Sequence, residues 1–250
     1  MDNKIYDQIY PFCKVRNVGH AGFNDLEPTP RVQFLEGLIA RLGIQYEVDQ
    51  FFASETPMCN IVLRGSSSRA VIAHHDIINP DSDNANDNSA SVINAIALKL
   101  LVPEINVFLV DGEEIGGLGS QRIAEEINRG SFGPLEWVLN LELTGIGGER
   151  FMIGDYPGPL HDRIRELFNP PVFKTPFNDS VILRSAGIDS CVINPLPLAE
   201  GADRGLKWKD EGFLDLRPLS RCHSMRDSLT EISTADMQAF VERVLVPIVR

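Results

Sequence analysis

A chain of 250 residues with 43% hydrophobic content can form one large α/β domain or two small ones. Its formal net charge of −12 argues against a nucleic-acid partner, because such binding depends on cationic groups that neutralise phosphates. No apolar stretch approaches the roughly 20 residues that span a bilayer, and the first residues lack a signal-peptide layout. We therefore expect a cytoplasmic protein with no membrane partner.

The predicted elements alternate between helices and short apolar strands. A helix is predicted over residues 31–42, where apolar residues recur at helical spacing. The strand-like runs are NIVL, RAVIAHHD, INVFLVDGEE, WVLNLEL, FMIGD and SCVINP. The later helix-like segments are SASVINAIALKLL, SQRIAEEINR, HDRIRELF and TADMQAFVERVLVPIV. This alternation predicts an α/β fold with a mixed, largely parallel sheet between two helical layers, and ligand sites beyond the carboxyl ends of its strands.

Polar residues gather at three of these predicted strand ends. Residues 74–76 follow one run, residues 111–114 the next, and residues 140–142 a third. Acids or histidine at three separate strand ends are hard to explain by solvation of the surface alone. The pattern indicates a functional site.

The first of these ends is His74-His75-Asp76. Side chains alternate along a strand, so His74 and Asp76 are predicted to share one face, and His75 to point to the other. That arrangement suits a metal-binding histidine whose ring is oriented by a nearby carboxylate. The alternative for His74 is a hydrogen-bonded core histidine.

Asp87, Glu113 and Glu114 each have two interpretations. Asp87 in NANDNSASV is either a metal ligand or the N-cap of the helix that begins near Asn88 or Ser89. Glu113 and Glu114 follow a buried strand, where adjacent carboxylates repel unless a cation or a shared proton separates them. Their alternative is a solvated first helical turn, where acids suit the helix dipole.

Glu142 and His223 complete the set of candidate ligands. Glu142 lies in the apolar run WVLNLEL, where a buried acid needs a metal or a salt bridge to arginine. His223 in SRCHSMRDS is either a ligand or a surface histidine. Imidazole and carboxylate are ligand types that zinc takes. A dizinc hydrolase needs a bridging ligand, terminal ligands and a spare carboxylate that accepts a proton from water.

The cysteines do not join this pattern. Cys13, Cys59, Cys191 and Cys222 stand far apart, with no CxxC pair. We expect reduced thiols packed as small apolar groups and assign them no zinc role.

The order HxD, NDNSAS, DGEE, NLE and CHSxxD resembles the M28 family of zinc peptidases, relatives of bacterial aminopeptidases and glutaminyl cyclases, from about residue 60 onward. The resemblance implies one compact α/β/α domain of the phosphorylase/hydrolase-like type over residues 1–250. The spacings from His74 to Asp87 and from Glu142 to His223 leave no room for the insert domain of M42 peptidases or the dimerisation domain of M20 enzymes.

The resemblance also implies two zinc ions that share one bridging carboxylate. The first zinc would be held by His74, Asp87 and Glu142. The second would be held by Asp87, Glu114 and His223, with Asp87 as the bridge. The same resemblance implies that Glu113 is the general base and that Asp76 contacts His74 without binding the metal itself.

Three positions depart from the family pattern. Glu142 stands where many members have Asp, which lengthens the ligand arm. Cys222 precedes the last histidine where some aminopeptidases place a Tyr that stabilises the oxyanion. Ser180 follows Asp179 where a histidine is frequent. These departures affect the substrate more than the metal centre.

The resulting hypothesis is a dizinc aminopeptidase that acts on a peptide or aminoacyl amide. The nearest alternative is a glutaminyl-cyclase-like acyltransferase with one zinc. Another is a non-catalytic protein stabilised by metal, against which the spare carboxylate of Glu113 argues. Neither nucleotide motif, GxxxxGK(S/T) or GxGxxG, occurs. Residues 197–221 are expected to form a loop near the site, in which Arg204, Arg217 and Arg221 are either solvated or meet a substrate carboxylate. The sequence does not predict the oligomeric state.

Overall fold

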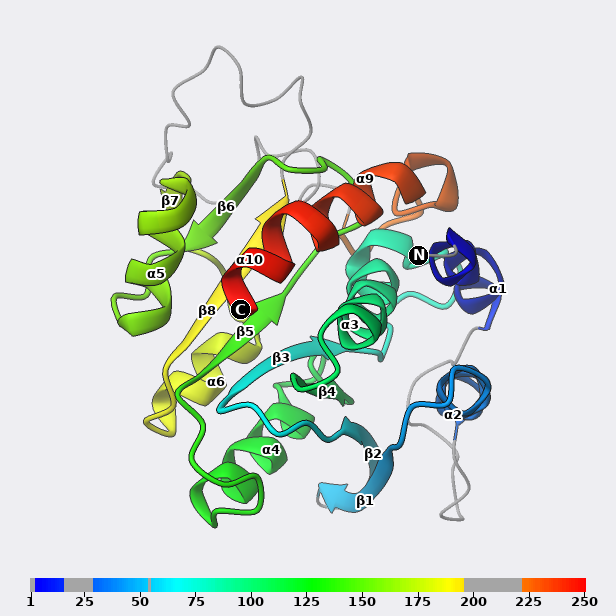
Figure 1. Ribbon diagram of the computed structural model, residues 1–250. Helices are drawn as coiled ribbons and strands as arrows, with labels where there is room; N and C mark the ends of the chain where they lie inside the picture. Colours follow the sequence, from blue (N-terminus) through cyan, green and yellow to red (C-terminus); the bar gives the residue numbers. More distant parts are fainter. Residues whose placement is uncertain (1–2, 16–28, 54, 196–221) are drawn as a thin grey trace.

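The computed structural model describes residues 3–15, 29–53, 55–195 and 222–250. One eight-stranded sheet runs through them in the order β1-β2-β4-β3-β5-β8-β6-β7 (Figure 1). The strands are β1 (Glu47–Ala53), β2 (Thr56–Leu63), β3 (Arg69–His74), β4 (Asn106–Val110), β5 (Trp137–Leu141), β6 (Phe151–Gly154), β7 (Val172–Phe173) and β8 (Ser190–Pro195).

The sheet is parallel at its centre and antiparallel toward its edges. Strands β4, β3, β5 and β8 run parallel to one another. Antiparallel pairing joins β1 to β2, β2 to β4, and β6 to β8, whereas β7 runs parallel to β6. The expectation of a mixed α/β sheet with a parallel core is confirmed.

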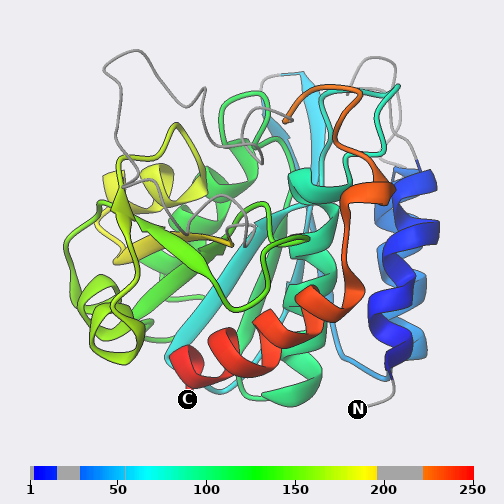
Figure 2. The ribbon, with the colours of Figure 1, turned by 90° about the horizontal axis from the view of Figure 1, so that it is seen from above.

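Helices cover both faces of the sheet. The longer ones are α2 (Pro30–Arg41), α3 (Ala90–Leu101), α4 (Leu118–Asn128), α5 (Pro159–Phe168), α6 (Asp179–Ser185) and α9 (Thr234–Phe240). The shorter helical segments are η1 (Asn3–Gln8), α1 (Ile9–Lys14), η2 (Ala85–Ser89), η3 (Leu229–Glu231), η4 (Val241–Leu245) and α10 (Val246–Val249). Seen from above, η1 and α1 run beside α2 at one end of the sheet, and α5 lies toward the other end (Figure 2).

Strand alternation divides the core into two layers. Val71 and Ala73 of β3 belong to the larger apolar cluster, which contains the buried residues of α2, α3, α5 and α9. Ala70 and Ile72 face the other way and belong to a smaller cluster with the buried apolar residues of α4 and α6. Because side chains repeat every two residues, His74 at the end of β3 continues the smaller layer.

Most predicted elements are present close to their predicted bounds. Helix α2 begins at Pro30, directly after Thr29, whose side chain accepts a hydrogen bond from the Val32 amide. The predicted closing helix is divided into α9, η4 and α10. The sequence patterns did not predict β1, β7, η1, α1 and α6. Strand β1 is a half-exposed edge strand, and β7 has two residues, so neither carries a buried apolar run.

The carboxyl ends of β3, β4 and β5 meet at one edge of the sheet, and each is followed by a loop with predicted site residues. The turn after β4 packs tightly, because a Cβ at Gly119 would lie 2.4 Å from the Asp111 carbonyl oxygen. Within the described residues, no helix has the length and apolar character needed to cross a bilayer.

Candidate metal centre

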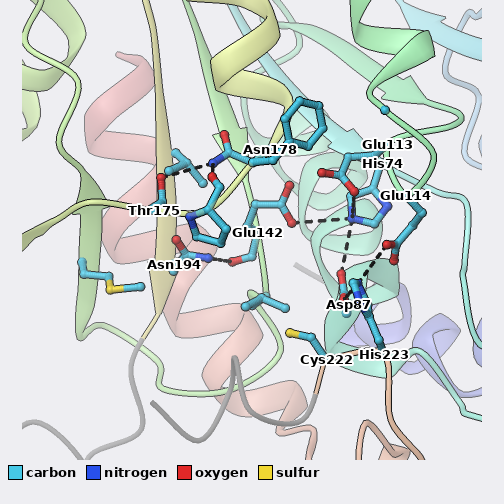
Figure 3. A pocket seen from close by; sticks show the side chains of 16 residues that line it. His74, Asp87, Glu113, Glu114, Glu142, Thr175, Asn178, Asn194, Cys222 and His223 are labelled. Carbon is cyan, nitrogen blue, oxygen red and sulfur yellow. Dashed lines mark hydrogen bonds and ion pairs between the residues drawn. The ribbon is translucent and has the colours of Figure 1, made fainter. Parts of the chain in front are cut away.

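The five predicted ligands lie together at this edge of the sheet (Figure 3). His74 Nε2 is 3.4 Å from Asp87 Oδ1 and 3.6 Å from Glu142 Oε2. His223 Nε2 is 3.4 Å from Asp87 Oδ2 and 2.9 Å from Glu114 Oε2. The two oxygens of Asp87 therefore face two different histidines, each of which has a second carboxylate beside it.

These spacings fit two zinc-sized cations that share Asp87. Zinc binds nitrogen and oxygen at about 2.0–2.1 Å, so tetrahedral ligand atoms lie about 3.3 Å apart. One group of candidate ligands is His74, Asp87 and Glu142, and the other is Asp87, Glu114 and His223. Within each group, one ligand atom of each residue lies within 4.8 Å of the others. Glu114 Oε1 is also buried without a hydrogen-bond partner among the described residues. A buried carboxylate oxygen without a donor fits a site built for a cation.

Asp76 lies behind the His74 ring. The His74 side chain is 1% exposed, and its Nδ1 lies 3.3 Å from Asp76 Oδ1, on the opposite side of the ring from the carboxylate cluster. The Asp76 carboxylate also accepts hydrogen bonds from the backbone amides of Glu113 and Glu114, at 3.3 and 3.1 Å. Asp76 therefore connects the end of β3 to the turn after β4, which carries both glutamates.

His75 has a different environment, as strand alternation predicts. Its Nε2 lies 2.9 Å from the Cys59 carbonyl oxygen, and the residue is buried. Burial lowers the pKa of His75 to about 4, so the ring is neutral near neutral pH. His75 is a hydrogen-bonded core histidine that faces away from the carboxylate cluster.

Of the two interpretations of Asp87, the N-cap of the following helix is wrong. Helix α3 begins at Ala90, and Asp87 has non-helical backbone angles within η2. The Asp87–Asn88 peptide bond is cis. The Asp87 carboxylate lies beside His74 and His223 instead of accepting the first helical amides. The loop turns this side chain into the site.

Burial raises the pKa of the Glu114 and Glu142 carboxyls, and neighbouring Asp87 adds to the shift. At His74 burial alone would lower the pKa, but Glu142, Asp76 and Asp87 outweigh it and raise the pKa well above its ordinary value. A divalent cation would reverse the shifts of the carboxyls, because an opposite charge favours the ionised form. The electrostatics, like the spacings, fit a cation.

Glu113 lies beside the two ligand groups. Its Oε2 is 4.0 Å from His74 Nε2, and it lines the pocket. Burial raises the pKa of Glu113 to about 10; the charges of Glu142 and Asp179 add to this shift, and His74 opposes it. Glu113 belongs to neither group that contains Asp87, but it forms a third candidate ligand group with His74 and Glu114.

The metal centre opens into a pocket of about 450 Å³. Apolar side chains of β6, β8 and the segment after β5 form part of its wall, and neutral polar side chains form another part. The apolar residues are Met152, Val192 and Leu143, and the neutral polar residues are Thr175, Asn178 and Asn194. This wall leaves room for a substrate group beside the candidate ligands (Figure 3).

Sequence reasoning missed two buried residues next to the site. The Asn88 side chain donates to the Leu141 carbonyl at 2.9 Å and accepts from the Leu143 amide at 3.2 Å, so it clamps the backbone on both sides of Glu142. Asp179 is fully buried, and burial together with Glu142 raises its pKa to about 7. Asp at a helix start is ordinary in sequence, and only the fold shows that this one lies inside.

Two further expectations concern the cysteines and the loop after β8. Cys13, Cys59 and Cys191 are buried free thiols, as expected. Cys222 is also a free thiol, but it is half-buried and lines the pocket instead of packing in the core. The predicted loop over residues 197–221, with Arg204, Arg217 and Arg221, lies outside the described residues.

The fold and site define an α/β protein with a histidine–carboxylate cluster that could hold metal ions at the carboxyl edge of its sheet. Residues 61–246 match the model of peptidase family M28, and the chain belongs to that family. Among curated proteins, no sequence is similar enough to count as a match.

Solved structures with a similar fold include aminopeptidases and glutaminyl cyclases. LapA aminopeptidase of Legionella pneumophila is 15% identical, with a TM-score of 0.68 over 100% of this chain and 70% of that one. BSAP, a zinc aminopeptidase from Bacillus subtilis, is 18% identical, with a TM-score of 0.58 over 78% and 49%. A glutaminyl cyclase from an Acidobacteriales bacterium is 18% identical, with a TM-score of 0.71 over 98% and 92%. At these identities the likeness shows the fold.

Proposed function

We propose that this protein is a zinc-dependent aminopeptidase that releases the N-terminal residue of a peptide or aminoacyl amide. One observation carries the proposal: two ligand groups share Asp87, and Glu113 lies beside them without belonging to either. This arrangement suits two cations and one proton acceptor. Membership of peptidase family M28 supports hydrolysis of a peptide bond.

Each residue has a separate role in this proposal. His74, Asp87 and Glu142 hold one zinc, and Asp87, Glu114 and His223 hold the other. When bound, zinc polarises a scissile carbonyl and makes water more acidic. Glu113 accepts the proton of the attacking water and transfers it to the leaving amine. Asp76 keeps the His74 ring oriented.

A glutaminyl-cyclase-like activity is the second candidate. The similarity to the Acidobacteriales cyclase covers 98% of this chain with a TM-score of 0.71, against 78% and 0.58 for BSAP, which supports this candidate. In a cyclisation, the amine of an N-terminal glutamine attacks its own side-chain amide and ammonia leaves. Glu113 would then move the proton from the amine to the leaving ammonia, and one zinc would suffice.

The deciding experiment combines metal analysis with two substrate sets. Purified protein is loaded with zinc, its metal content is measured, and it is incubated with aminoacyl amides and with peptides that begin with glutamine. Release of free amino acids with two zinc ions per chain supports the aminopeptidase. Release of ammonia with formation of a pyroglutamyl peptide supports the cyclase instead. Zinc binding without either reaction supports the metal-stabilised binding protein, and no zinc binding contradicts all three.

Two broader expectations stay predictions. One is that residues 1–250 form a single domain without a separate lid or dimerisation domain. The other is a cytoplasmic location. The first is checked by limited proteolysis, which should leave one resistant core, and the second by localisation of the tagged protein in its native cell.

A further inference from the structure

The turn that carries His223 is tied to the loop that carries Asp87. Asn79 Nδ2 donates to the His223 carbonyl at 3.3 Å, and Ser82 Oγ donates to the Asp227 carbonyl at 2.8 Å. Residues 79–87 and 223–227 lie far apart in the sequence but form one hydrogen-bonded unit.

The Asp227 side chain makes the closest link to the bridging ligand. Its Oδ1 accepts a hydrogen bond from the Asn86 amide at 2.7 Å, and its Oδ2 accepts one from the Asp87 amide at 3.0 Å. Asp227 is buried, so these charge-assisted bonds are little weakened by water. They hold the backbone from which the Asp87 carboxylate projects.

Asp227 also belongs to the turn of His223. Its backbone amide donates to the Ser224 carbonyl at 3.0 Å, one residue after His223. The His223 side chain is 54% exposed, so packing does not fix its position. The His223 backbone has a φ of 60°, in the left-handed region that is unfavourable for residues other than glycine. The position of its imidazole relative to Asp87 depends on this turn and its hydrogen bonds.

We propose that Asp227 is a positioning residue that sets the distance between Asp87 and His223. This inference rests on the proposed metal centre and concerns its second ligand group. The first group is supported differently, because His74 ends a central strand and Asn88 clamps the backbone around Glu142. Asp87 belongs to both groups, but the turn of His223 belongs to the second alone. Loss of the Asp227 carboxylate therefore weakens the ion at His223 more than the ion at His74.

The test compares Asp227→Asn with the wild-type chain by competition between the protein and a zinc chelator. The amide can accept only one of the two backbone hydrogen bonds. Loss of an outer partner of a metal ligand typically costs about 10–100-fold in metal affinity. We expect that loss for the zinc ion at His223 and a smaller loss for the ion at His74, which shares only Asp87. His223→Ala, which removes a ligand of the second group, identifies which ion is affected.

Asp83→Asn is the matched control. Asp83 lies in the same loop, where its carboxylate accepts hydrogen bonds from the Leu229 amide and from Lys14 Nζ. Its variant should keep both zinc affinities. Asp227→Glu, which retains two acceptor oxygens, should recover part of the lost affinity, whereas a purely structural role would show as an equal loss at both ions.

If the wild-type chain binds zinc, an equal loss of affinity at both ions, or no loss at either, overturns the proposal. Failure of the wild-type chain to bind zinc would instead overturn the metal centre itself. If Asp227→Asn does not fold, Ser82→Ala replaces it. That change removes the hydrogen bond to the Asp227 carbonyl and the one that Ser82 Oγ accepts from the Asn84 amide, and it leaves the Asp227 carboxylate in place. Ser82→Ala should then weaken binding of the same zinc ion as His223→Ala. Zinc affinities equal to those of the wild-type chain would overturn the inference.

Discussion

The two ligand groups of the candidate metal centre are built in different ways. The His74 side chain is 1% exposed and extends from a strand held by neighbours on both sides, whereas the His223 side chain is 54% exposed and lies in a turn held by hydrogen bonds. Side chains on strands are held more precisely than side chains on loops. The comparison predicts that the ion at His74 is the more tightly held of the two.

The largest expected effect comes from Glu113→Gln, which should leave both groups intact. The amide cannot accept the proton of the attacking water, so turnover should fall by about 100- to 10,000-fold. Zinc content should equal that of the wild-type protein. Activity on aminoacyl amides and elemental analysis measure the two quantities. Full activity in this variant would show that Glu113 is not the base.

His74→Ala tests the buried group. The variant removes a ligand, so its zinc affinity should fall by more than the roughly 10–100-fold that an outer partner costs. His75→Ala is the adjacent control. It leaves the buried Cys59 carbonyl without its imidazole partner and should cost about 1–3 kcal/mol of folding stability while zinc stays bound. If His75→Ala lost zinc and His74→Ala kept it, the face of β3 that carries His75 would be the one at the metal.

Glu114→Gln tests the exposed group. A neutral amide oxygen is a weaker ligand than a carboxylate, so zinc binding at His223 should weaken, and activity should recover in part when excess zinc is supplied. Glu113→Gln should show no such recovery. The opposite result, recovery with zinc in Glu113→Gln and none in Glu114→Gln, would exchange the roles of the two glutamates.

The smallest expected effect is seen when a chelator is added gradually to the wild-type protein: the two zinc ions should leave in two separate steps. We expect the ion at the exposed His223 to leave first and the ion at His74 to leave at higher chelator concentration. Zinc content measured along the titration shows whether there are two steps. In His223→Ala the first step should be missing. Simultaneous release of both ions would contradict the comparison between the two groups.

Much of the fold could be predicted because the central strands are buried on both faces. Runs such as RAVIAHH and WVLNLEL are mostly apolar and carry polar residues near their carboxyl ends. This pattern indicates both the parallel sheet and the edge where a ligand would bind. Edge strand β1 is half-exposed and shows no such run. It was missed for that reason.

The sequence by itself determined which residue types are available for a metal centre and that His74 and His75 point in opposite directions, because local alternation follows from the geometry of a strand. Only the tertiary structure decided that Asp87 faces two histidines instead of capping α3. The same holds for Asp227, whose hydrogen bonds reach residues about 140 positions away. Spacing along the chain carries no information about such contacts, since they arise when separate strand ends and loops meet at one edge of the sheet.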